Sequence, residues 1–180
     1  MKEDKALTPT FGVLLALAIT VLLSAMFYSG IDFSKLKEPI FAVLGISEKI
    51  TPHEAGLGNT SQIVKIYNNG GDSIYVGKVK LVVKIYRDGE LLKQVACQGF
   101  PVNNFSEAFC SGDDIIDESD LGYTVLGELH KSSDGYFSSG EFIGFRIKSD
   151  SVKLERGDVV QVEVIDIESG LILAKLEKIV

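Results

Sequence analysis

The stretch KVKLVVKIYRDGELLKQVAC, residues 78–97, decides the fold class of the larger part of this chain. Its first half alternates apolar residues with lysines: Val79, Leu81, Val83 and Ile85 against Lys78, Lys80 and Lys84. That period of two is typical of a strand with one buried face and one exposed face. Asp88 and Gly89 then form a turn dipeptide that favours tight hairpins. We therefore expect strands over 78–86 and 91–97, joined as an antiparallel hairpin.

More short β-rich runs flank this hairpin. They lie at residues 63–67, 123–129, 142–148, 159–167 and 171–176. Turn sequences such as NNGGDS, ERGD and ESG separate them. Short strands with little helix between them favour a mostly antiparallel β-sandwich of Ig-like or pilin type, which we place at residues 62–180.

The N-terminal part has a different pattern. No charged residue occurs from residue 7 to 31, and a helix of that length spans about 37 Å, more than the roughly 30 Å of a bilayer core. Thr8 suits the N-cap and Pro9 the first helical position. Apolar residues continue at roughly helical spacing: Phe33, Leu36, Ile40, Phe41, Leu44 and Ile46. We therefore expect an α+β protein, in which a long hydrophobic transmembrane or filament-core helix over 7–50 leads through a linker at 51–61 into the β-sandwich.

Charge and cysteine content limit the functions open to the chain. The formal net charge is −7 and no basic stripe is present, so nucleic-acid binding is not expected. If the N-terminal segment directs export, Cys97 and Cys110 lie outside the cytoplasm, where a disulfide persists. We expect them to form one, with two separate buried thiols as the alternative. Zinc is disfavoured, because these cysteines and the two histidines, His53 and His130, lack the close paired spacing of structural sites.

Motifs that carry catalysis are missing from the sequence. It contains no G-x-S-x-G, no phosphate loop, no H-E-x-x-H and no C-x-x-C. We therefore expect no enzymatic activity, no catalytic residues, no metal and no cofactor. The acidic run GDDIIDESD, residues 112–120, offers clustered carboxylates that calcium could use, but its spacing is not that of an EF-hand. A solvated acidic loop is the alternative that we favour.

Two sequons for N-glycosylation occur in predicted loops. Asn59 stands in NTS and Asn104 in NFS. Both are candidate glycosylation sites of an exported domain, and an unmodified protein is the alternative.

The charged head KEDK and the apolar tract behind it allow three fates: a removed secretion signal, a permanent anchor, or part of an assembly. A secretory signal needs a positive head and a small-x-small cleavage site after its apolar region. Here Lys2 and Lys5 are balanced by Glu3 and Asp4, and the sequence SAMFYSG fits the cleavage rule poorly. Cleavage after the tract is therefore disfavoured.

The residues before the tract favour cleavage at its start. Lys5 and Ala6 precede the apolar Leu7, from which the chain reads LTPTFGVLLALAITVLLSA. This stretch closely resembles the N-terminal domain of archaeal type IV pilins, a Ser/Thr-Pro-x-x-Gly followed by an apolar run containing AITV. The matching residues are Thr8, Pro9, Gly12 and residues 18–21. Three segments, GGDSI, SSGEFIGFRI and LERGDVVQVEVIDIESGLILAKLEKIV, resemble the β-domain of many members more loosely.

The resemblance implies a processing and assembly pathway. An aspartyl prepilin peptidase removes residues 1–6, a class III leader, between Ala6 and Leu7, with Lys5 in the processing site. An assembly ATPase and a platform membrane protein then lift the subunit from the cell membrane into a helical homopolymer at the cell surface, which serves adhesion. Apolar side chains of the helix would make the polymer contacts: Phe11, Leu14, Leu15, Ile19 and Leu22. Bacterial type IV pilins carry a glutamate at the fifth mature position, which is Phe11 here, and archaeal pilins often lack it.

The apolar tract supports assembly independently of the resemblance. A helix that is apolar all round packs with similar ease in lipid or among identical helices, and in water it needs neighbours to cover it. The alternative function is a membrane-anchored extracellular β-domain, as a minor pilin or a ligand-binding protein, that does not polymerise and keeps its N-terminus at Met1 or Lys2. A secreted hydrolase is disfavoured by the missing site motifs.

Overall fold

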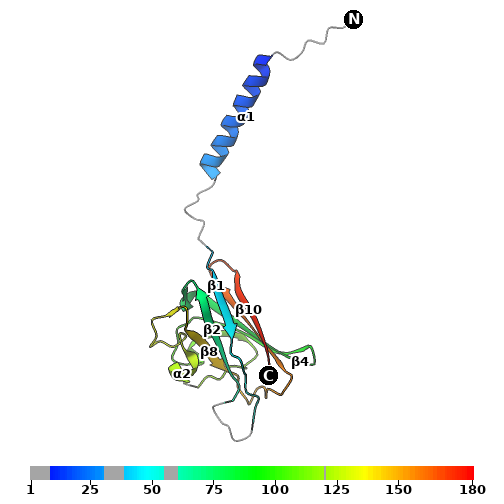
Figure 1. Cartoon of the computed structure of the whole chain (residues 1–180), viewed down its shortest axis with the longest axis vertical. Coiled ribbons are helices and arrows are strands. Elements are labelled where there is room, and N and C mark those ends of the chain that lie inside the picture. Colours follow the sequence, from blue (N-terminus) through cyan, green and yellow to red (C-terminus); the bar gives the residue numbers. More distant parts are fainter. Residues whose placement is uncertain (1–8, 31–38, 55–60, 120) are drawn as a thin grey trace. The chain divides into compact units, whose positions relative to one another are not determined.

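The chain divides into two units, which are described separately. The computed structural model describes residues 9–30, 39–54, 61–119 and 121–180. The first unit, Met1–Pro39, contains helix α1, Pro9–Gly30. The second unit, Ile40–Val180, has strands as its main regular secondary structure, and we call it the β-domain (Figure 1).

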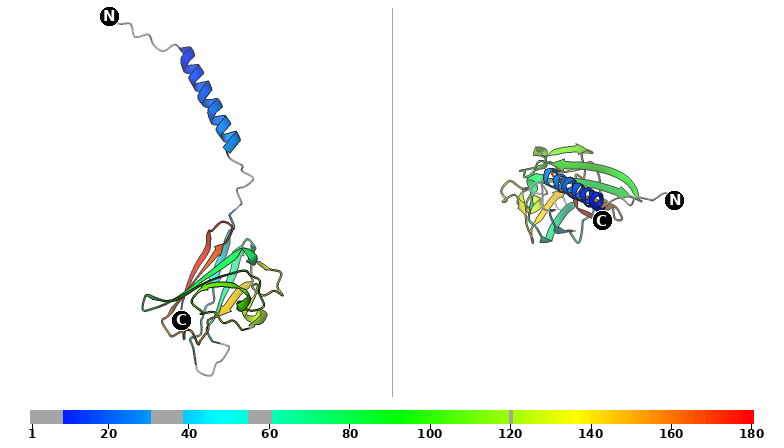
Figure 2. Two further views of the ribbon diagram at one scale, coloured as in Figure 1. Left: turned by 180° about the vertical axis from the view of Figure 1, so that it is seen from behind. Right: turned by 90° about the horizontal axis from the view of Figure 1, so that it is seen from above.

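Antiparallel sheets form the β-domain (Figures 1 and 2). The three-stranded sheet has the order β1-β2-β8, with bounds Ala42–Ile46, Ile63–Gly71 and Phe142–Arg146. The five-stranded sheet has the order β10-β9-β4-β5-β6, with bounds Ile172–Ile179, Val159–Asp166, Val79–Arg87, Glu90–Gln98 and Phe109–Gly112. A two-stranded ribbon pairs β3, Ile74–Tyr75, with β7, Tyr136–Phe137. Three short helical elements lie among the described residues of this domain: η3, Val76–Lys78; η4, Phe105–Glu107; and α2, Gly122–Leu126.

One hydrophobic core is shared by the two larger sheets. The five-stranded sheet contributes alternate residues of β4 and β9: Leu81, Val83, Ile85, Val160, Val162 and Val164. The three-stranded sheet contributes Val64, Ile66, Ile143 and Phe145. Burying a side chain of this size stabilises the fold by about 1.5–3 kcal/mol relative to leaving it exposed. The edge strands β1 and β10 of the two sheets lie side by side.

The predicted hairpin over 78–97 is confirmed. Strands β4 and β5 pair antiparallel, with Val83 opposite Val95 and Arg87 opposite Glu90. Asp88 and Gly89, at φ +54° and +82°, both adopt the left-handed backbone that a tight primed turn requires. The predicted β-rich character of the chain is likewise confirmed.

The predicted long N-terminal helix over 7–50, and the α+β class based on it, are wrong. The protein is mostly β, and the helix that the structure describes runs from Pro9 to Gly30. Residues 42–46, which we expected at the end of the helix, form strand β1. Across the described residues, no helix combines the length and the apolar character that crossing a membrane requires.

Strand β1 was missed because its apolar residues fit two periods. Leu44 and Ile46 suit a helical spacing from Ile40, but Ala42, Leu44 and Ile46 also stand at alternate positions. All four residues pack against the core. Pairing with β2, from Ala42 opposite Gly71 to Ile46 opposite Ile66, decides between the two periods.

The predicted strand over 123–129 is also wrong, since helix α2 occupies its first half. Glycines at both ends of the helix, Gly122 and Gly127, have φ near +57°, which a continuous strand does not allow. The short helix lies against Gly144 of β8, where a Cβ atom would come within 2.2 Å of the Val125 carbonyl oxygen. The close contact therefore depends on the missing side chain at Gly144.

Candidate functional site

Helix α1 presents an apolar surface to solvent. All residues from 11 to 25 are exposed, and the large apolar ones have exposed fractions between 49% and 64%. They include every predicted polymerisation residue: Phe11, Leu14, Leu15, Ile19 and Leu22. Successive residues of a helix point about 100° apart, so an uninterrupted exposed run covers every side of it. No charged residue occurs in this run.

Within the exposed run of residues 11–25, the two hydroxyl groups, those of Thr20 and Ser24, are satisfied inside the helix. Thr20 Oγ1 donates a hydrogen bond to the Ala16 carbonyl oxygen at 2.7 Å, and Ser24 Oγ donates to the Thr20 carbonyl oxygen at 2.7 Å. Neither hydroxyl therefore needs water as a partner, and burying this surface leaves no unpaired donor. The predicted processing residues Lys5, Ala6 and Leu7 and the sequon residue Asn59 lie outside the described residues.

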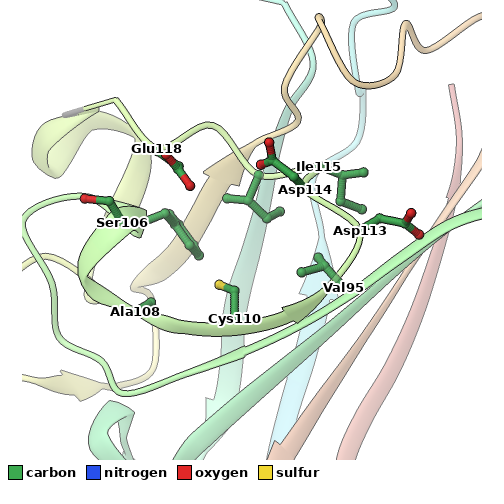
Figure 3. A pocket seen from close by; sticks show the side chains of 10 residues that line it. Val95, Ser106, Ala108, Cys110, Asp113, Asp114, Ile115 and Glu118 are labelled. Atoms are coloured by element: carbon green, nitrogen blue, oxygen red, sulfur yellow. The ribbon is translucent and has the colours of Figure 1, made fainter.

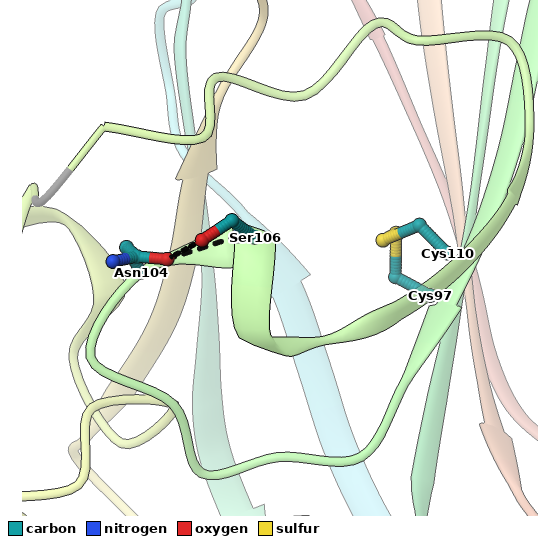
Figure 4. Close-up of a disulfide and its surroundings, with 4 residues drawn as sticks. All are labelled: Cys97, Asn104, Ser106 and Cys110. Atoms are coloured by element: carbon teal, nitrogen blue, oxygen red, sulfur yellow. Dashed lines mark hydrogen bonds between the residues drawn. A yellow bond between two sulfur atoms is a disulfide. The ribbon is translucent and has the colours of Figure 1, made fainter.

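The predicted disulfide between Cys97 and Cys110 is confirmed (Figure 4). The two residues stand opposite each other on β5 and β6, with Cα atoms 4.1 Å apart. Strand β6 lies at the edge of its sheet and all four of its residues are exposed. The covalent link therefore holds a strand that buries little apolar surface. Oxidised cysteines offer no thiolate to a zinc ion.

The sequon at Asn104 begins the turn η4. Asn104 Oδ1 accepts a hydrogen bond from the Ser106 backbone N–H at 3.1 Å and a second one from the Ser106 hydroxyl (Figure 4). The asparagine and serine side chains of this sequon are thus in contact, and the asparagine amide nitrogen points away from Ser106. Glycosylation of Asn104 remains a prediction.

The acidic loop, residues 112–119, is fixed by ion pairs with the rest of the β-domain. Lys93 Nζ lies 3.1 Å from Asp113 Oδ1, and Lys148 Nζ lies 2.6 Å from Asp114 Oδ2. Arg146 Nε of β8 donates to Asp117 Oδ2 at 2.7 Å. These three carboxylates already have protein cations as partners. Within the described ranges, no group of three or more His, Cys, Asp or Glu side chains is placed to hold a metal ion.

Hydrogen bonds lower the pKa of two aspartates of this loop, Asp113 and Asp117. The Gln94 backbone N–H and the Lys93 ammonium hold the pKa of Asp113 below its ordinary value. Burial would raise the pKa of Asp117, but hydrogen bonds from Ser119 and Arg146 outweigh it and lower that pKa. The loop therefore follows β6 and is held against β8 by the ion pair between Asp117 and Arg146. It is not the freely solvated loop that we favoured from the sequence.

A small pocket of about 180 Å³ lies beneath the acidic loop (Figure 3). Apolar side chains form part of its wall: Val95, Phe105, Ala108, Ile115 and Ile116. Ser106, Asp114 and Glu118 add polar groups. The Ser106 hydroxyl is bonded to Asn104, an amide that cannot take its proton, so the pocket lacks the serine–base pair of nucleophilic catalysis.

A buried carboxyl group, Glu128, was not singled out from the sequence. It is 4% exposed and follows α2. Burial and the neighbouring carboxylates of Glu141 and Asp134 raise its pKa. The segment 123–129 was interpreted as a short strand, and its sequence gives no sign that Glu128 is buried.

Comparison with known proteins adds no further assignment. No family model matches the chain, and no curated protein matches it.

Proposed function

We propose that this protein is a structural subunit of an archaeal type IV pilus-like filament that assembles through helix α1. The observation that carries the proposal is the uncharged surface of residues 11–25, exposed on every side of the helix. Each large apolar side chain that becomes covered contributes about 1.5–3 kcal/mol, so exposed helices of this kind associate strongly in water. Identical helices are the occupants that the chain itself supplies, and identical contacts repeated along an axis build a filament.

The resemblance of residues 7–25 to pilin N-termini supports the same proposal. In this proposal a prepilin peptidase cuts between Ala6 and Leu7, an assembly ATPase and a platform protein drive assembly, and the precursor is held at the cell membrane. The β-domains lie on the outside of the filament at the cell surface, where they serve attachment. A disulfide at Cys97 and Cys110 suits a domain that works outside the reducing cytoplasm.

Processing is tested by changing the residue before the proposed cut. Ala6→Phe should leave a precursor that begins at Met1 or Lys2 and makes no filaments, whereas Ala6→Ser, which keeps a small side chain, should be cut normally. N-terminal sequencing and electron microscopy of the native cell surface measure the two outcomes. Filaments of normal number from Ala6→Phe would overturn the proposal.

A second candidate is an extracellular β-domain that binds a ligand and does not polymerise. The observation in its favour is that the β-domain has its own core, formed entirely by residues from Ile40 onward. The two candidates differ in the mature N-terminus, which is Leu7 for the filament subunit and Met1 or Lys2 for the non-polymerising protein.

A further inference from the structure

We infer that the outer face of the three-stranded sheet binds a neutral oligosaccharide. The face carries an aromatic row of Tyr67, Phe142 and Tyr123, whose ring centroids are 6.0 Å apart from Tyr67 to Phe142 and 6.2 Å apart from Phe142 to Tyr123. Tyr67 and Phe142 are paired across β2 and β8, and Tyr123 belongs to α2. The ring planes are tilted by 48° between Tyr67 and Phe142 and by 58° between Phe142 and Tyr123, so each ring offers its own face to a sugar ring.

The two tyrosines at the ends of the row are open to a ligand. Tyr67 is 37% exposed and Tyr123 is 53% exposed. Phe142 is partly covered, because Lys65 Nζ lies 4.4 Å above its ring centroid. The electron-rich face of an aromatic ring attracts the polarised C–H groups of a sugar as it attracts the positive edge of another ring. The row therefore offers a stacking surface at each end.

A groove of about 600 Å³ adjoins Tyr67. We call it the tyrosine groove, and these residues line it: Gly45, Ile46, Ser47, Glu48, Lys49, Tyr67 and Asn69. Gly45 stands opposite Tyr67 in the β1–β2 register, so the tyrosine ring has no side chain beside it on β1. The volume lies within the range of small-ligand sites, about 300–1,000 Å³.

The tyrosine groove is lined by polar groups that can form hydrogen bonds with hydroxyl groups. The Asn69 amide nitrogen lies 2.6 Å from the position that a Gly45 Cβ would take. This amide therefore covers Gly45, and both residues line the groove. The Ser47 hydroxyl is buried and has no hydrogen-bond partner among the described residues, so its side chain would have to rotate toward the groove to bond to a ligand. Amide, hydroxyl and carboxylate groups can each accept a hydrogen bond from a sugar hydroxyl, and the first two can also donate one.

Charge favours a neutral ligand over an ionic one. Glu48 and Lys49 are adjacent and both exposed, so their opposite charges offset each other at the rim of the groove. The remaining cation nearby, Lys65, already lies over Phe142. The inference does not need the filament, because a single chain carries the whole site.

Titration of the full chain with neutral trisaccharides tests the inference. The probes are cellotriose, chitotriose and mannotriose, added at millimolar concentration to protein in a detergent without a sugar headgroup. The chain has no tryptophan and six tyrosines, two of which, Tyr67 and Tyr123, belong to the aromatic row, so tyrosine fluorescence includes a signal from the row. We expect saturable binding of at least one probe.

Variants then locate the binding site. Tyr67→Ala should weaken binding about tenfold or more, because the sugar loses both the stacking contact and the area that the ring covers. Tyr67→Phe keeps the ring and should keep most of the affinity. Gly45→Leu should abolish binding by filling the groove and displacing the Asn69 amide, whose nitrogen lies 2.6 Å from the position of the new Cβ atom. The matched control is Tyr136→Ala, which removes a tyrosine of similar exposure, 49%, from the β3–β7 ribbon and should bind normally.

Two results would contradict the inference. No saturable response to any of the three probes would overturn it. Binding that Tyr67→Ala and Gly45→Leu leave unchanged would also overturn it, because the sugar would then lie elsewhere. Thermal melting of each variant separates loss of binding from loss of folding. Neither result bears on filament assembly, which is measured separately by cleavage and microscopy.

Discussion

The guanidinium group of Arg87 donates a bidentate pair of hydrogen bonds to the two carboxylate oxygens of Asp158. Arg87 Nε donates to Asp158 Oδ1 at 2.8 Å, and a terminal Arg87 nitrogen donates to Oδ2 at 2.9 Å. The Asp158 side chain is 2% exposed, whereas Arg87 also reaches the exposed Glu155 at 2.8 Å. The pair joins the end of β4 to the turn before β9, and the Asp158 backbone carbonyl accepts from the Val180 N–H. It therefore fixes both the hairpin and the C-terminus.

Removing the charge of Asp158 should cost more than removing that of Glu155. We expect Asp158→Asn to lower the free energy of unfolding by about 2–3 kcal/mol, because a charged hydrogen-bond partner is lost from a buried position. Glu155→Gln, at a side chain that is 65% exposed, should change it by less than about 0.5 kcal/mol. Urea denaturation at pH 7 compares the two. Equal losses would show that burial does not set the strength of this pair.

The same pair predicts a pH dependence. The Arg87 hydrogen bond lowers the pKa of Asp158, so the native state binds a proton there less readily than the unfolded chain does. Its stabilisation is present above the ordinary aspartate pKa and is lost as the pH falls through the lowered native value. Wild-type stability should therefore decline toward acidic pH, and Asp158→Asn should decline less steeply.

Glu128 predicts a pH dependence of stability with the opposite sign to that of Asp158. Its pKa is raised, chiefly by burial and then by Glu141, so the native state binds a proton there more readily than the unfolded chain does. The stability that this group contributes is greatest below the ordinary glutamate pKa and is lost as the pH rises through the raised native value. Glu128→Gln should therefore raise the melting temperature at pH 7 and have little effect near pH 4.

The control for Glu128→Gln is Glu90→Gln, in the exposed hairpin turn, which should leave the melting temperature nearly unchanged at both pH values. A stabilisation by Glu128→Gln that is equal at pH 4 and pH 7 would contradict the electrostatic cause and point to packing alone.

The disulfide should contribute strongly to the stability of the β-domain. Cys97 and Cys110 are 13 residues apart, and closing a loop of this size contributes about 3 kcal/mol. Two changes remove the disulfide: replacing both cysteines by alanine, and reducing the wild type with dithiothreitol. Each should lower the melting temperature of the β-domain, and the two decreases should be similar to each other. A reduced wild type that melts like the oxidised protein would show that the β5–β6 pairing needs no covalent link.

Local patterns were enough to predict the parts of the fold that neighbouring residues determine. The hairpin at 78–97 follows from alternation and the Asp88–Gly89 turn, both readable within twenty residues. Strand β1 was not readable in this way, because Leu44 and Ile46 fit both a helix and a strand and only pairing with β2 decides. Pairing partners that are distant in sequence leave no local signal.

The same limit applies to the sites. Cys97 and Cys110 were predicted to bond because they are the only two cysteines in the chain. The partners of the acidic loop were not predicted, since Arg146 and Asp117 meet only through the placement of β8. The aromatic row was missed for the same reason: Tyr67 and Phe142 become neighbours when β2 pairs with β8.

The proposed filament predicts that one charge on α1 is far more damaging than the same charge on the β-domain. Leu15 and Leu91 are 54% and 53% exposed, so leucine to aspartate changes a similar area at both positions. A buried unpaired carboxylate costs several kcal/mol, and in a polymer the cost recurs in every subunit. Leu15→Asp should therefore prevent assembly, Leu15→Ile should permit it, and Leu91→Asp should give filaments of normal length.

Two measurements make this comparison decisive. N-terminal sequencing shows whether the Leu15→Asp chain is still cut between Ala6 and Leu7, and electron microscopy shows whether filaments form. A processed subunit that does not assemble places the defect in helix contacts, as we expect. Normal filaments from Leu15→Asp would contradict a polymer held together by α1, because an aspartate would then be tolerated at a position that the proposal buries. Loss of filaments in Leu91→Asp as well would place essential contacts on the β-domain instead.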